Sequence, residues 1–443
     1  MHINECLLMT IRQIRSSKNT MLQPQFIREN FDQVLTGLQK RGLNAKPLLE
    51  EAIKLDDARK AAQKELDDVL QASNALAREI GELFKSGQRE QADAKKAFTS
   101  ELKLKEKTLS DILQSAEQAL TDCLRSIPNV PHESVPSGKS ADDNLEVFNW
   151  GNIPDLPEDA SPHWDLAKRY DIIDFELGVK ITGAGFPVYK GKGARLQRAL
   201  INFFLDKNTA AGYEEVMPPH FVNEDSAYGT GQLPDKEGQM YFMPVDNLYA
   251  IPTAEVPVTN IYRNEIVDHT KLPIRNTAYT PCFRREAGSY GKDVRGLNRL
   301  HQFDKVEIVV IERPEKSYER LEEMVNHVGS LLQALELPYR ILKLCGGDMG
   351  FTSALTYDFE VYSAAQKRWL EVSSTSNFES FQANRLKLRY KDDNNKPQLC
   401  HTLNGSALAL PRIVAAMLEN HQTQEGIRIP AALQSYTGFN LLS

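Results

Sequence analysis

The segment from Cys282 to Glu307 carries the residues of this sequence that are best suited to chemistry on a phosphorylated substrate. Arg284 and Glu286 stand two residues apart, so on a strand both side chains would point to the same face. The arginine could clamp a phosphate, and the carboxylate could accept a hydrogen bond from an exocyclic amine. A surface ion pair is the alternative for the same two residues. The pair alone therefore does not decide a function.

An aromatic ring and two further charges follow in the same segment. Phe303, Lys305 and Glu307 alternate along an expected strand, which would place a ring for base stacking beside a cation and an anion. No Walker A sequence is present, and the glycines from Gly191 to Gly193 lack the spacing of a dinucleotide fingerprint. We interpret those glycines as helix packing. If ATP is a substrate, it must be held without a phosphate-binding loop.

Two later segments supply the remaining groups that a nucleotide site needs. Glu371 and Ser374 offer hard oxygen ligands, which suit a Mg²⁺ ion that bridges phosphates. Arg412 stands near the start of an expected helix, where it would add a second phosphate clamp. The spacing of these residues therefore predicts a site for a nucleoside triphosphate.

The elements that must position these residues follow an α+β order. Strand patterns come consecutively, without a helix between each pair, which favours an antiparallel sheet over a doubly wound parallel one. The expected strands are 214–217, 278–283, 302–311, 339–344, 356–362 and 368–374. The expected helices are 193–211, 317–335 and 409–420. Clustered prolines predict a loop-rich linker near 130–165.

The N-terminal part of the sequence predicts a pair of long helices. From Lys46 to Cys123, apolar or small residues recur at alternating steps of four and three, a heptad pattern interrupted at Arg59 and Lys105. The polar segment from Lys85 to Asp93 breaks the register, which predicts a helical hairpin with helices of about 35–40 residues. Both a dimerisation coiled coil and an arm for a large partner are open, because acidic residues are as numerous as basic ones.

Composition and charge limit the class of protein. The 443 residues are 41% hydrophobic and carry a net charge of −7, so a packed core is expected and a general basic excess for nucleic acid is absent. Five scattered cysteines fit a reducing cytosol, and no apolar run reaches membrane-spanning length, so we expect a cytoplasmic protein and no membrane partner. Residues 1–20 are weakly basic, and we expect a disordered extension from an upstream start codon, with organelle targeting as the alternative.

In their order along the chain, these segments resemble the class II aminoacyl-tRNA synthetases. The segments around Arg284 and Arg412 are similar to motifs 2 and 3, and Pro219 stands where motif 1 has its signature proline. More narrowly, residues 21 to 440 resemble the bacterial-type seryl-tRNA synthetases. The hallmarks are Tyr228-Gly-Thr-Gly-Gln-Leu-Pro234, Thr253-Ala-Glu255, His301-Gln-Phe303, Glu371-Val-Ser-Ser374 and Asn404-Gly-Ser406.

The resemblance implies an activity, a fold and partners. The family activates L-serine with ATP to seryl-adenylate and transfers it to the 3′ end of tRNA(Ser), with tRNA(Sec) as a further candidate. The implied fold is α+β, with a long antiparallel helical hairpin and a catalytic domain whose antiparallel sheet is flanked by helices. The implied domains are an extension (1–20), a tRNA-binding arm (21–130) and a catalytic domain (131–443). A homodimer and Mg²⁺ are implied as well.

The resemblance also implies roles for individual residues. The expected catalytic residues are Arg284, Glu286 and Arg412. The expected ATP-binding residues are Arg284, Arg285, Glu286, Arg299, Leu300, Phe303, Glu371, Val372, Ser373, Ser374 and Arg412. The expected serine-binding residues are Thr253, Ala254, Glu255, Arg284, Glu307, Asn404 and Ser406. The expected Mg²⁺ ligands are Glu371 and Ser374.

The family pattern is not matched everywhere. Ala407 and Pro411 stand where the family usually has glycines, but a proline in the first turn of a helix costs little. We interpret His301 as structural support for motif 2 rather than as a general base. Zinc, which an archaeal branch uses, is not expected, although Cys282, Cys345, Cys400 and His401 could meet in space.

Two rival functions remain open at this point. One is a related enzyme that loads a small amino acid onto a carrier protein, and the long hairpin argues against it. The other is a non-enzymatic coiled-coil adaptor with a dead synthetase domain, and the intact Arg284, Glu286, Glu371 and Arg412 argue against it.

Overall fold

The computed structural model describes residues 22–156, 160–235, 237–286 and 295–443. These residues form two compact units, the first from Leu22–Gln39 and Leu43–Pro128, the second from Lys40–Gly42 and Asn129–Ser443. The predicted extension 1–20 lies outside the described residues.

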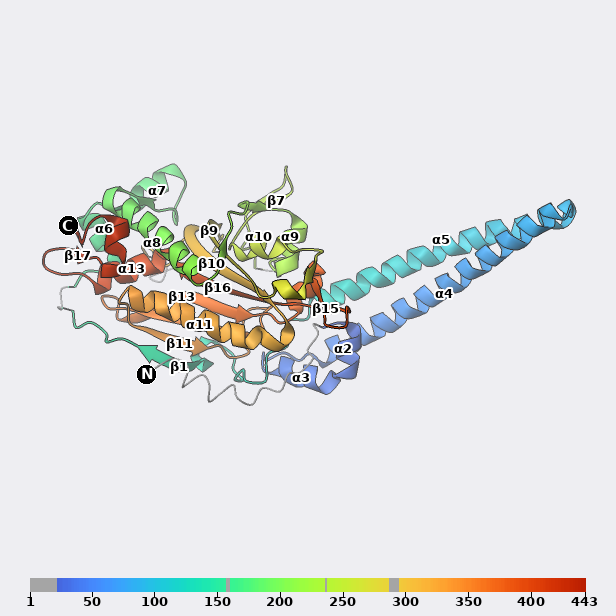
Figure 1. Ribbon diagram of the computed structural model, residues 1–443, viewed down its shortest axis with the longest axis horizontal. Coiled ribbons are helices and arrows are strands. Elements are labelled where there is room, and N and C mark those ends of the chain that lie inside the picture. The colour runs from blue at the N-terminus through green and yellow to red at the C-terminus, as the bar shows by residue number, and fades with distance from the viewer. Residues whose placement is uncertain (1–21, 157–159, 236, 287–294) are drawn as a thin grey trace. The chain divides into compact units, whose positions relative to one another are not determined.

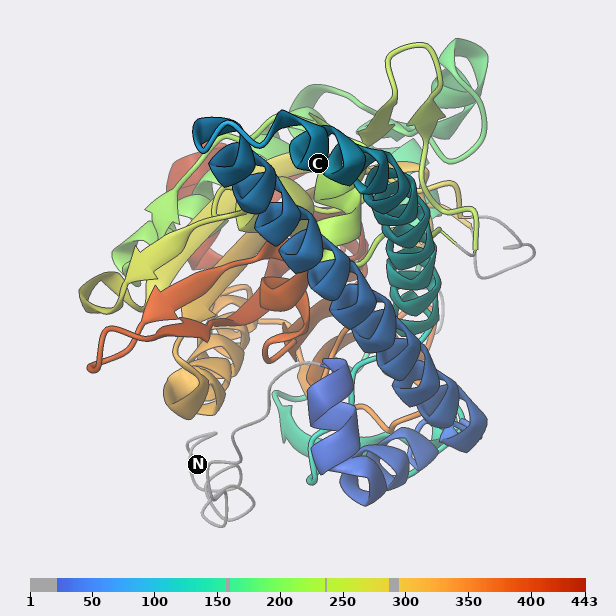
Figure 2. The same cartoon turned by 90° about the vertical axis from the view of Figure 1, so that its right-hand side faces the viewer.

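The first unit is the predicted helical hairpin. Its two long helices, α4 (Lys46–Lys85) and α5 (Arg89–Arg125), lie side by side in both views (Figures 1 and 2). Leu66, Val69 and Leu109 are buried in the seam between them. The turn takes only residues 86–88, so the predicted polar break is shorter than expected. Two short helices precede the hairpin, α2 (Pro24–Glu29) and α3 (Phe31–Gln39).

The second unit is built on an eight-stranded sheet in the order β1-β11-β12-β13-β16-β10-β9-β4. Every neighbouring pair is antiparallel except β4 and β9, which are parallel, so the predicted α+β fold is confirmed. The strands of this sheet are β1 (Leu145–Trp150), β4 (Glu214–Glu215), β9 (Ile274–Phe283), β10 (Gln302–Glu312), β11 (Tyr339–Lys343), β12 (Leu355–Ser363), β13 (Arg368–Asn377) and β16 (His401–Ala409).

Helices and small sheets complete this unit (Figure 1). The helices are α6 (His163–Arg169), α7 (Phe175–Ile181), α8 (Gly191–Ala210), α9 (Glu224–Thr230), α10 (Glu255–Asn260), α11 (Ser317–Ala334), α12 (Phe381–Leu386), α13 (Leu410–Asn420) and α14 (Ala431–Thr437). The short strands are β2 (Ile173–Asp174), β3 (Val188–Tyr189), β5 (Phe221–Val222), β6 (Phe242–Met243), β7 (Leu248–Ala250), β8 (Ile266–Asp268), β14 (Arg389–Lys391), β15 (Pro397–Leu399), β17 (Ile427–Arg428) and β18 (Leu441–Leu442). Helices α8, α11 and α13 were predicted to within about two residues.

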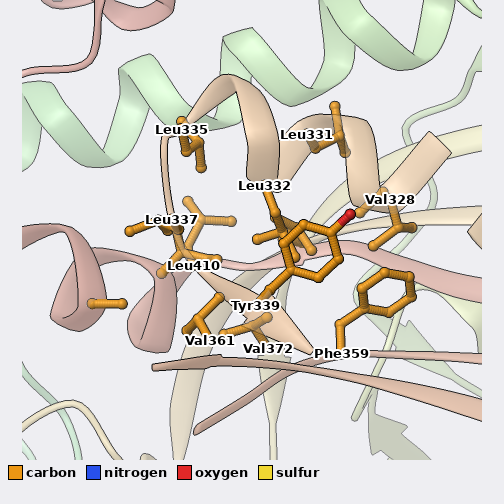
Figure 3. Close-up of a cluster of buried hydrophobic side chains, with 14 of the residues drawn as sticks. Val328, Leu331, Leu332, Leu335, Leu337, Tyr339, Phe359, Val361, Val372 and Leu410 are labelled. Carbon is orange, nitrogen blue, oxygen red and sulfur yellow. The ribbon is translucent and has the colours of Figure 1, made fainter. Parts of the chain in front are cut away.

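Alternation along the central strands separates the hydrophobic core from a polar face. On β10, Val306, Ile308 and Val310 belong to the main core, while Lys305 and Glu307 point to the opposite face. Figure 3 shows part of this core, where leucines of α11 lie against Tyr339, Phe359 and Val372 of the sheet and Leu410 of α13. The hydrophobic core thus holds one face of the sheet in place, and the polar side chains of the other face are available to bind a ligand.

The structure corrects the predicted linker and adds a strand. Residues 130–165 are not only loop, because they contain β1, which pairs with β11 at one edge of the sheet. Strand β16 was not predicted, although it lies between β13 and β10 near the middle of the sheet. The interpretation of Gly193 as helix packing agrees with the structure, since a Cβ there would lie 2.2 Å from the carbonyl oxygen of Ile172.

Candidate active site

The predicted serine-binding residues meet at two buried carboxylates, Glu255 at the start of α10 and Glu307 on β10. The amide nitrogen of Asn404 on β16 donates to Glu255 Oε2 at 2.8 Å and to Glu307 Oε1 at 3.2 Å. The hydroxyls of Thr253 and Ser406 lie 3.3 and 3.5 Å from Glu307 Oε2. Two acids and small hydroxyl groups therefore form one compact polar cluster.

A buried cation pairs with one of the two acids of this cluster. Lys305 Nζ donates to Thr253 Oγ1 at 2.7 Å and forms an ion pair with Glu307. Burial, followed by the negative charge of Glu307, raises the pKa of Glu255 to about 7, against the opposing effect of Gln382 and nearby cations. Glu255 is thus poised to exchange a proton for another cation near neutral pH.

Two arginines at the end of β9 lie against aromatic rings. The guanidinium carbon of Arg284 lies 5.2 Å from the centre of the Phe303 ring, on the adjacent strand β10. The guanidinium carbon of Arg285 lies 5.5 Å from the centre of the Tyr241 ring. A cation beside an aromatic face suits a nucleotide, which offers both a phosphate and a base.

Glu286 does not lie where the strand pattern placed it. Strand β9 ends at Phe283, and Glu286 has a φ angle of 47°, which turns the backbone out of the extended conformation. The prediction that Arg284 and Glu286 share a strand face is therefore wrong. Glu286 Oε2 instead accepts from Arg299 Nε at 2.6 Å, which joins the two ends of a segment whose residues 287–294 lie outside the described residues.

Arg412 stands in the first turn of α13, as predicted, and connects two parts of the site. Its Nε donates to the carbonyl oxygen of Asn298 at 3.1 Å, and its Nη1 donates to the carbonyl oxygen of Glu371 at 2.7 Å. The same nitrogen lies 3.8 Å from the Glu371 carboxylate. The guanidinium is held in place by backbone atoms and remains about one-third exposed, at 31%.

An acidic group surrounds the predicted Mg²⁺ ligands. Glu371 is half exposed, and Ser374 lies opposite Asp358 in the β12–β13 register. Burial and then the charge of Glu371 raise the pKa of Asp358 well above its usual range, although a hydrogen bond from Ser374 opposes this. Among the described residues, Asp358 Oδ1 has no hydrogen-bond partner. Oxygen donors with unbalanced negative charge fit Mg²⁺, which binds through one or two carboxylates and substrate phosphates.

Other predicted residues turn their side chains away from the site. Leu300 and Val372 belong to the main core, and Ala254 is fully buried. The Ser373 hydroxyl donates to the carbonyl oxygen of Ser406 at 2.6 Å, which ties β13 to β16. At Ala254, Leu300 and Val372 only backbone atoms are left to contact a substrate.

The predicted motif 2 histidine makes structural contacts. His301 Nδ1 lies 3.0 Å from the carbonyl oxygen of Arg284, and its backbone N–H donates to Gly185 at 2.9 Å. Its ring stacks on Phe186, with 5.5 Å between the ring centres. These contacts connect the start and the end of motif 2.

The cysteines considered for zinc lie in different surroundings. Cys282 contacts Thr280, Cys345 donates to the carbonyl oxygen of Ser140, and Cys400 packs in a separate apolar cluster. Among residues 22–443, apart from the gaps in the description, no group of three or more His, Cys, Asp or Glu side chains is arranged to hold a metal ion.

Known proteins share both units of this chain. A family model described as the seryl-tRNA synthetase N-terminal domain matches residues 21–131, and one described as the tRNA synthetase class II core domain (G, H, P, S and T) matches residues 243–421. The serine–tRNA ligase of Salinibacter ruber is 51% identical over 421 residues, which cover 95% of this chain and 98% of the relative. The chain belongs to the seryl-tRNA synthetases.

Further relatives agree with this assignment. The serine–tRNA ligase of Prosthecochloris aestuarii is 48% identical over 430 residues, or 95% of this synthetase and 98% of the relative. The crystal structure of the seryl-tRNA synthetase from Pyrococcus horikoshii complexed with ATP has a TM-score of 0.87 at 35% identity and covers 95% and 99% of the two chains. The predicted family, fold class, serine–tRNA ligase activity and use of ATP are confirmed. No described helix of the synthetase is long and apolar enough to cross a membrane.

Three side chains in the site of this synthetase were not assigned a role from the sequence. Gln382 on α12 donates to Glu255 Oε1 at 2.6 Å, and no pattern in the sequence indicates that contact. Lys305 was placed on the correct strand face, but its burial against Glu307 was not predicted. Asp358 alternates with apolar residues along β12 in the same way as Glu360, so the sequence held no signal that set it apart.

Proposed function

We propose that Glu255 and Glu307 receive the ammonium group of serine, with Thr253, Asn404 and Ser406 completing the pocket. The observation that supports this assignment is the pair of buried carboxylates bridged by Asn404. Serine presents a cation and a small hydroxyl, and this pocket pairs both. A pocket that hydrogen-bonds a hydroxyl rejects analogues without it by large factors.

The same proposal assigns the nucleotide to the arginines and their neighbours. Arg284 grips the α-phosphate and the serine carboxylate, and Arg299 holds the triphosphate. Glu286 reads the adenine amino group, Phe303 stacks on the ring, and Arg412 lies on its other face or near the γ-phosphate. The proximity of Arg284 to Phe303, at 5.2 Å, supports a shared role for the two.

Two displacement steps follow from these positions. The serine carboxylate oxygen attacks the α-phosphorus, the bond to the β-phosphate oxygen breaks, and pyrophosphate leaves. A ribose hydroxyl of the terminal adenosine of the tRNA then attacks the acyl carbon of seryl-adenylate and releases AMP. Catalysis of this kind depends mainly on positioning and on neutralised charge, so no protein nucleophile is needed.

Mg²⁺ would be held by Glu371 and Ser374, with the carboxyl of Asp358 behind them. When bound, the ion would neutralise negative charge on the phosphates of the substrate. Burial and then the charge of Glu371 raise the pKa of Asp358, and a cation near the cluster would relieve the repulsion between the two carboxyl groups, which supports this position. Zinc is not part of the proposal.

The domains and partners complete the proposal. Residues 21–130 form the arm that binds tRNA(Ser), and also tRNA(Sec), while residues 131–443 form the catalytic domain. A homodimer is supported by exposed apolar side chains around the motif 1 proline, since Met217 is 90% and Phe221 51% exposed. Free buried thiols such as Cys282 agree with the cytoplasm as the working compartment.

ATP–pyrophosphate exchange with each amino acid tests the serine pocket. We expect exchange with serine, and exchange with alanine or glycine but not serine would contradict the assignment. To test the arm, residues 71–104 are replaced by a short Gly-Ser turn, which keeps Leu66 and Leu109 in the hairpin. Exchange should be spared, and charging of tRNA(Ser) should fall at least about a hundredfold, since phosphate and shape contacts are lost. Unimpaired charging would refute the role of the arm.

A further inference from the structure

A buried histidine far from motif 2 in the sequence holds the returning end of that motif. His163, the first residue of α6, is fully buried, and its Nε2 accepts from the backbone N–H of Leu297 at 2.8 Å. Gly296 fits closely over the ring, because a Cβ there would lie 2.3 Å from Nε2. The next residue, Trp164, lies under Arg295, whose guanidinium carbon is 4.6 Å from the centre of the indole ring.

The hydrogen bonds of His163 determine which of its nitrogens carries the proton. Nε2 accepts from an amide, so it has no proton, and Nδ1 must donate to Glu419 Oε1 at 2.8 Å. A protonated imidazolium could not accept from Leu297. The contact therefore requires a neutral imidazole oriented by a carboxylate, a pairing that fixes ring position in many enzymes.

Glu419 is the centre of this buried network. Its carboxylate accepts from the His163 backbone N–H at 3.0 Å, from Gln366 Nε2 at 2.9 Å and from the Ser363 hydroxyl. Burial alone would raise the pKa of Glu419, but the hydrogen bonds from His163 and Ser363 lower it instead. A buried carboxylate that accepts this many hydrogen bonds holds its partners in one arrangement.

A second connection reaches the same returning segment through a side chain. Asn298 Nδ2 donates to Gln366 Oε1 at 3.0 Å, and Gln366 in turn donates to Glu419. The backbone carbonyl of Asn298 accepts from Arg412 Nε at 3.1 Å. Arg412 and Glu419 both belong to α13. One helix therefore contacts residues 295–299 twice, directly through Arg412 and indirectly through Glu419.

We propose that His163 is a positioning residue for adenylate formation. With Glu419 and Gln366, it fixes residues 295–299 so that the Asn298 carbonyl holds Arg412 and the chain presents Arg299 to the nucleotide. This inference rests on the ATP roles proposed above for the two arginines. It concerns residues that touch no substrate and act only through the backbone of motif 2.

Two substitutions at His163 separate its two hydrogen bonds. His163→Asn keeps a donor near the Nδ1 position for Glu419 but removes the acceptor for Leu297, whereas His163→Gln keeps an acceptor near the Nε2 position. We expect H163N to raise the KM for ATP about tenfold in pyrophosphate exchange, with the KM for serine within about twofold. H163Q should recover most of that loss. His421→Asn is the matched control, because His421 is also buried and its ring bonds, within the described part of the chain, to the Leu335 carbonyl and Arg428 and not to motif 2.

The outcomes separate this inference from the function on which it rests. H421N should lower the melting temperature and leave the KM for ATP unchanged. An unchanged KM for ATP in H163N, or an equal rise in H163N, H163Q and H421N, would overturn the positioning role. Should H163N fail to fold, Gln366→Ala is expected to raise the KM for ATP about threefold, and no rise would overturn the inference. Absence of serine-dependent exchange in the unaltered enzyme would overturn the proposed function and this inference together.

Discussion

The affinity for serine should depend on pH through Glu255. This carboxyl is buried, and its pKa is raised to about 7. The groups that act on it are Glu307, Gln382, Lys305, Arg284 and Asn404. Because the pKa is raised, the proton stabilises the fold below the ordinary pKa of 4.5, and that stabilisation is lost as the pH rises through about 7. The ionised form of the empty pocket therefore carries a cost that the ammonium group of serine would relieve.

The size of the effect follows from the pKa. The shift from 4.5 to about 7 corresponds to on the order of 3 kcal/mol between the protonated and ionised forms. At pH 8 about nine in ten molecules have an ionised Glu255, and at pH 6 about one in ten. If only the ionised form binds serine, the KM for serine should rise about tenfold between pH 8 and pH 6.

Pyrophosphate exchange at saturating ATP, measured from pH 6 to 8.5, provides the test. The variant Glu255→Gln has no proton to exchange at this position, so its KM for serine should be higher and nearly independent of pH. Any titration of the serine ammonium group or of ATP would affect both proteins equally. A flat KM in the unaltered enzyme, or the same tenfold slope in E255Q, would refute the assignment of the titrating group.

Three further substitutions test other parts of the site and the arm. Arg412→Lys should raise the KM for ATP at least about tenfold, because a lysine cannot reach the carbonyls of Asn298 and Glu371 together; an unchanged KM would speak against the clamp. Asp358→Asn keeps a partner for Ser374 but removes an acid, so the Mg²⁺ concentration for half-maximal exchange should rise about tenfold, and an unaltered Mg²⁺ titration would exclude the role of Asp358. Leu109→Ala should destabilise the hairpin by about 2–3 kcal/mol in hydrogen exchange and raise the KM for tRNA(Ser) without affecting pyrophosphate exchange; equal losses in both assays would contradict a separate arm.

Elements with a clear periodicity could be predicted from the sequence. Strand β10 was recognisable because it is rich in β-branched residues from Val306 to Ile311, and the hairpin because its apolar residues keep heptad spacing. That Glu255, Glu307 and Asn404 meet agrees with their place in the family segments, while their role in binding serine is a proposal. The alternation of side chains along a strand also predicted that Lys305 and Glu307 lie on the same face of β10, and the structure agrees.

The remaining features depend on contacts between segments that are far apart in the sequence. Glu286 left its expected strand face because its backbone takes a positive φ and its carboxylate meets Arg299. Strand β1 exists only through pairing with β11, almost two hundred residues later, so its proline-rich surroundings concealed it. The contact of His163 with the backbone of Leu297 has no counterpart in local side-chain patterns.

The place of the proposed serine-binding residues within the sheet has a consequence for enzyme redesign. Glu307, Asn404 and Ser406 lie on β10 and β16, and each of these strands is paired on both sides. Such strands cannot move apart for a bulkier substrate without breaking ladder hydrogen bonds. Selection for non-natural amino acids should therefore succeed by exchanging side chains for smaller ones, and loop insertion or loop shuffling should contribute little. Because these strands are rigid, they should also leave no space for the extra methyl group of threonine.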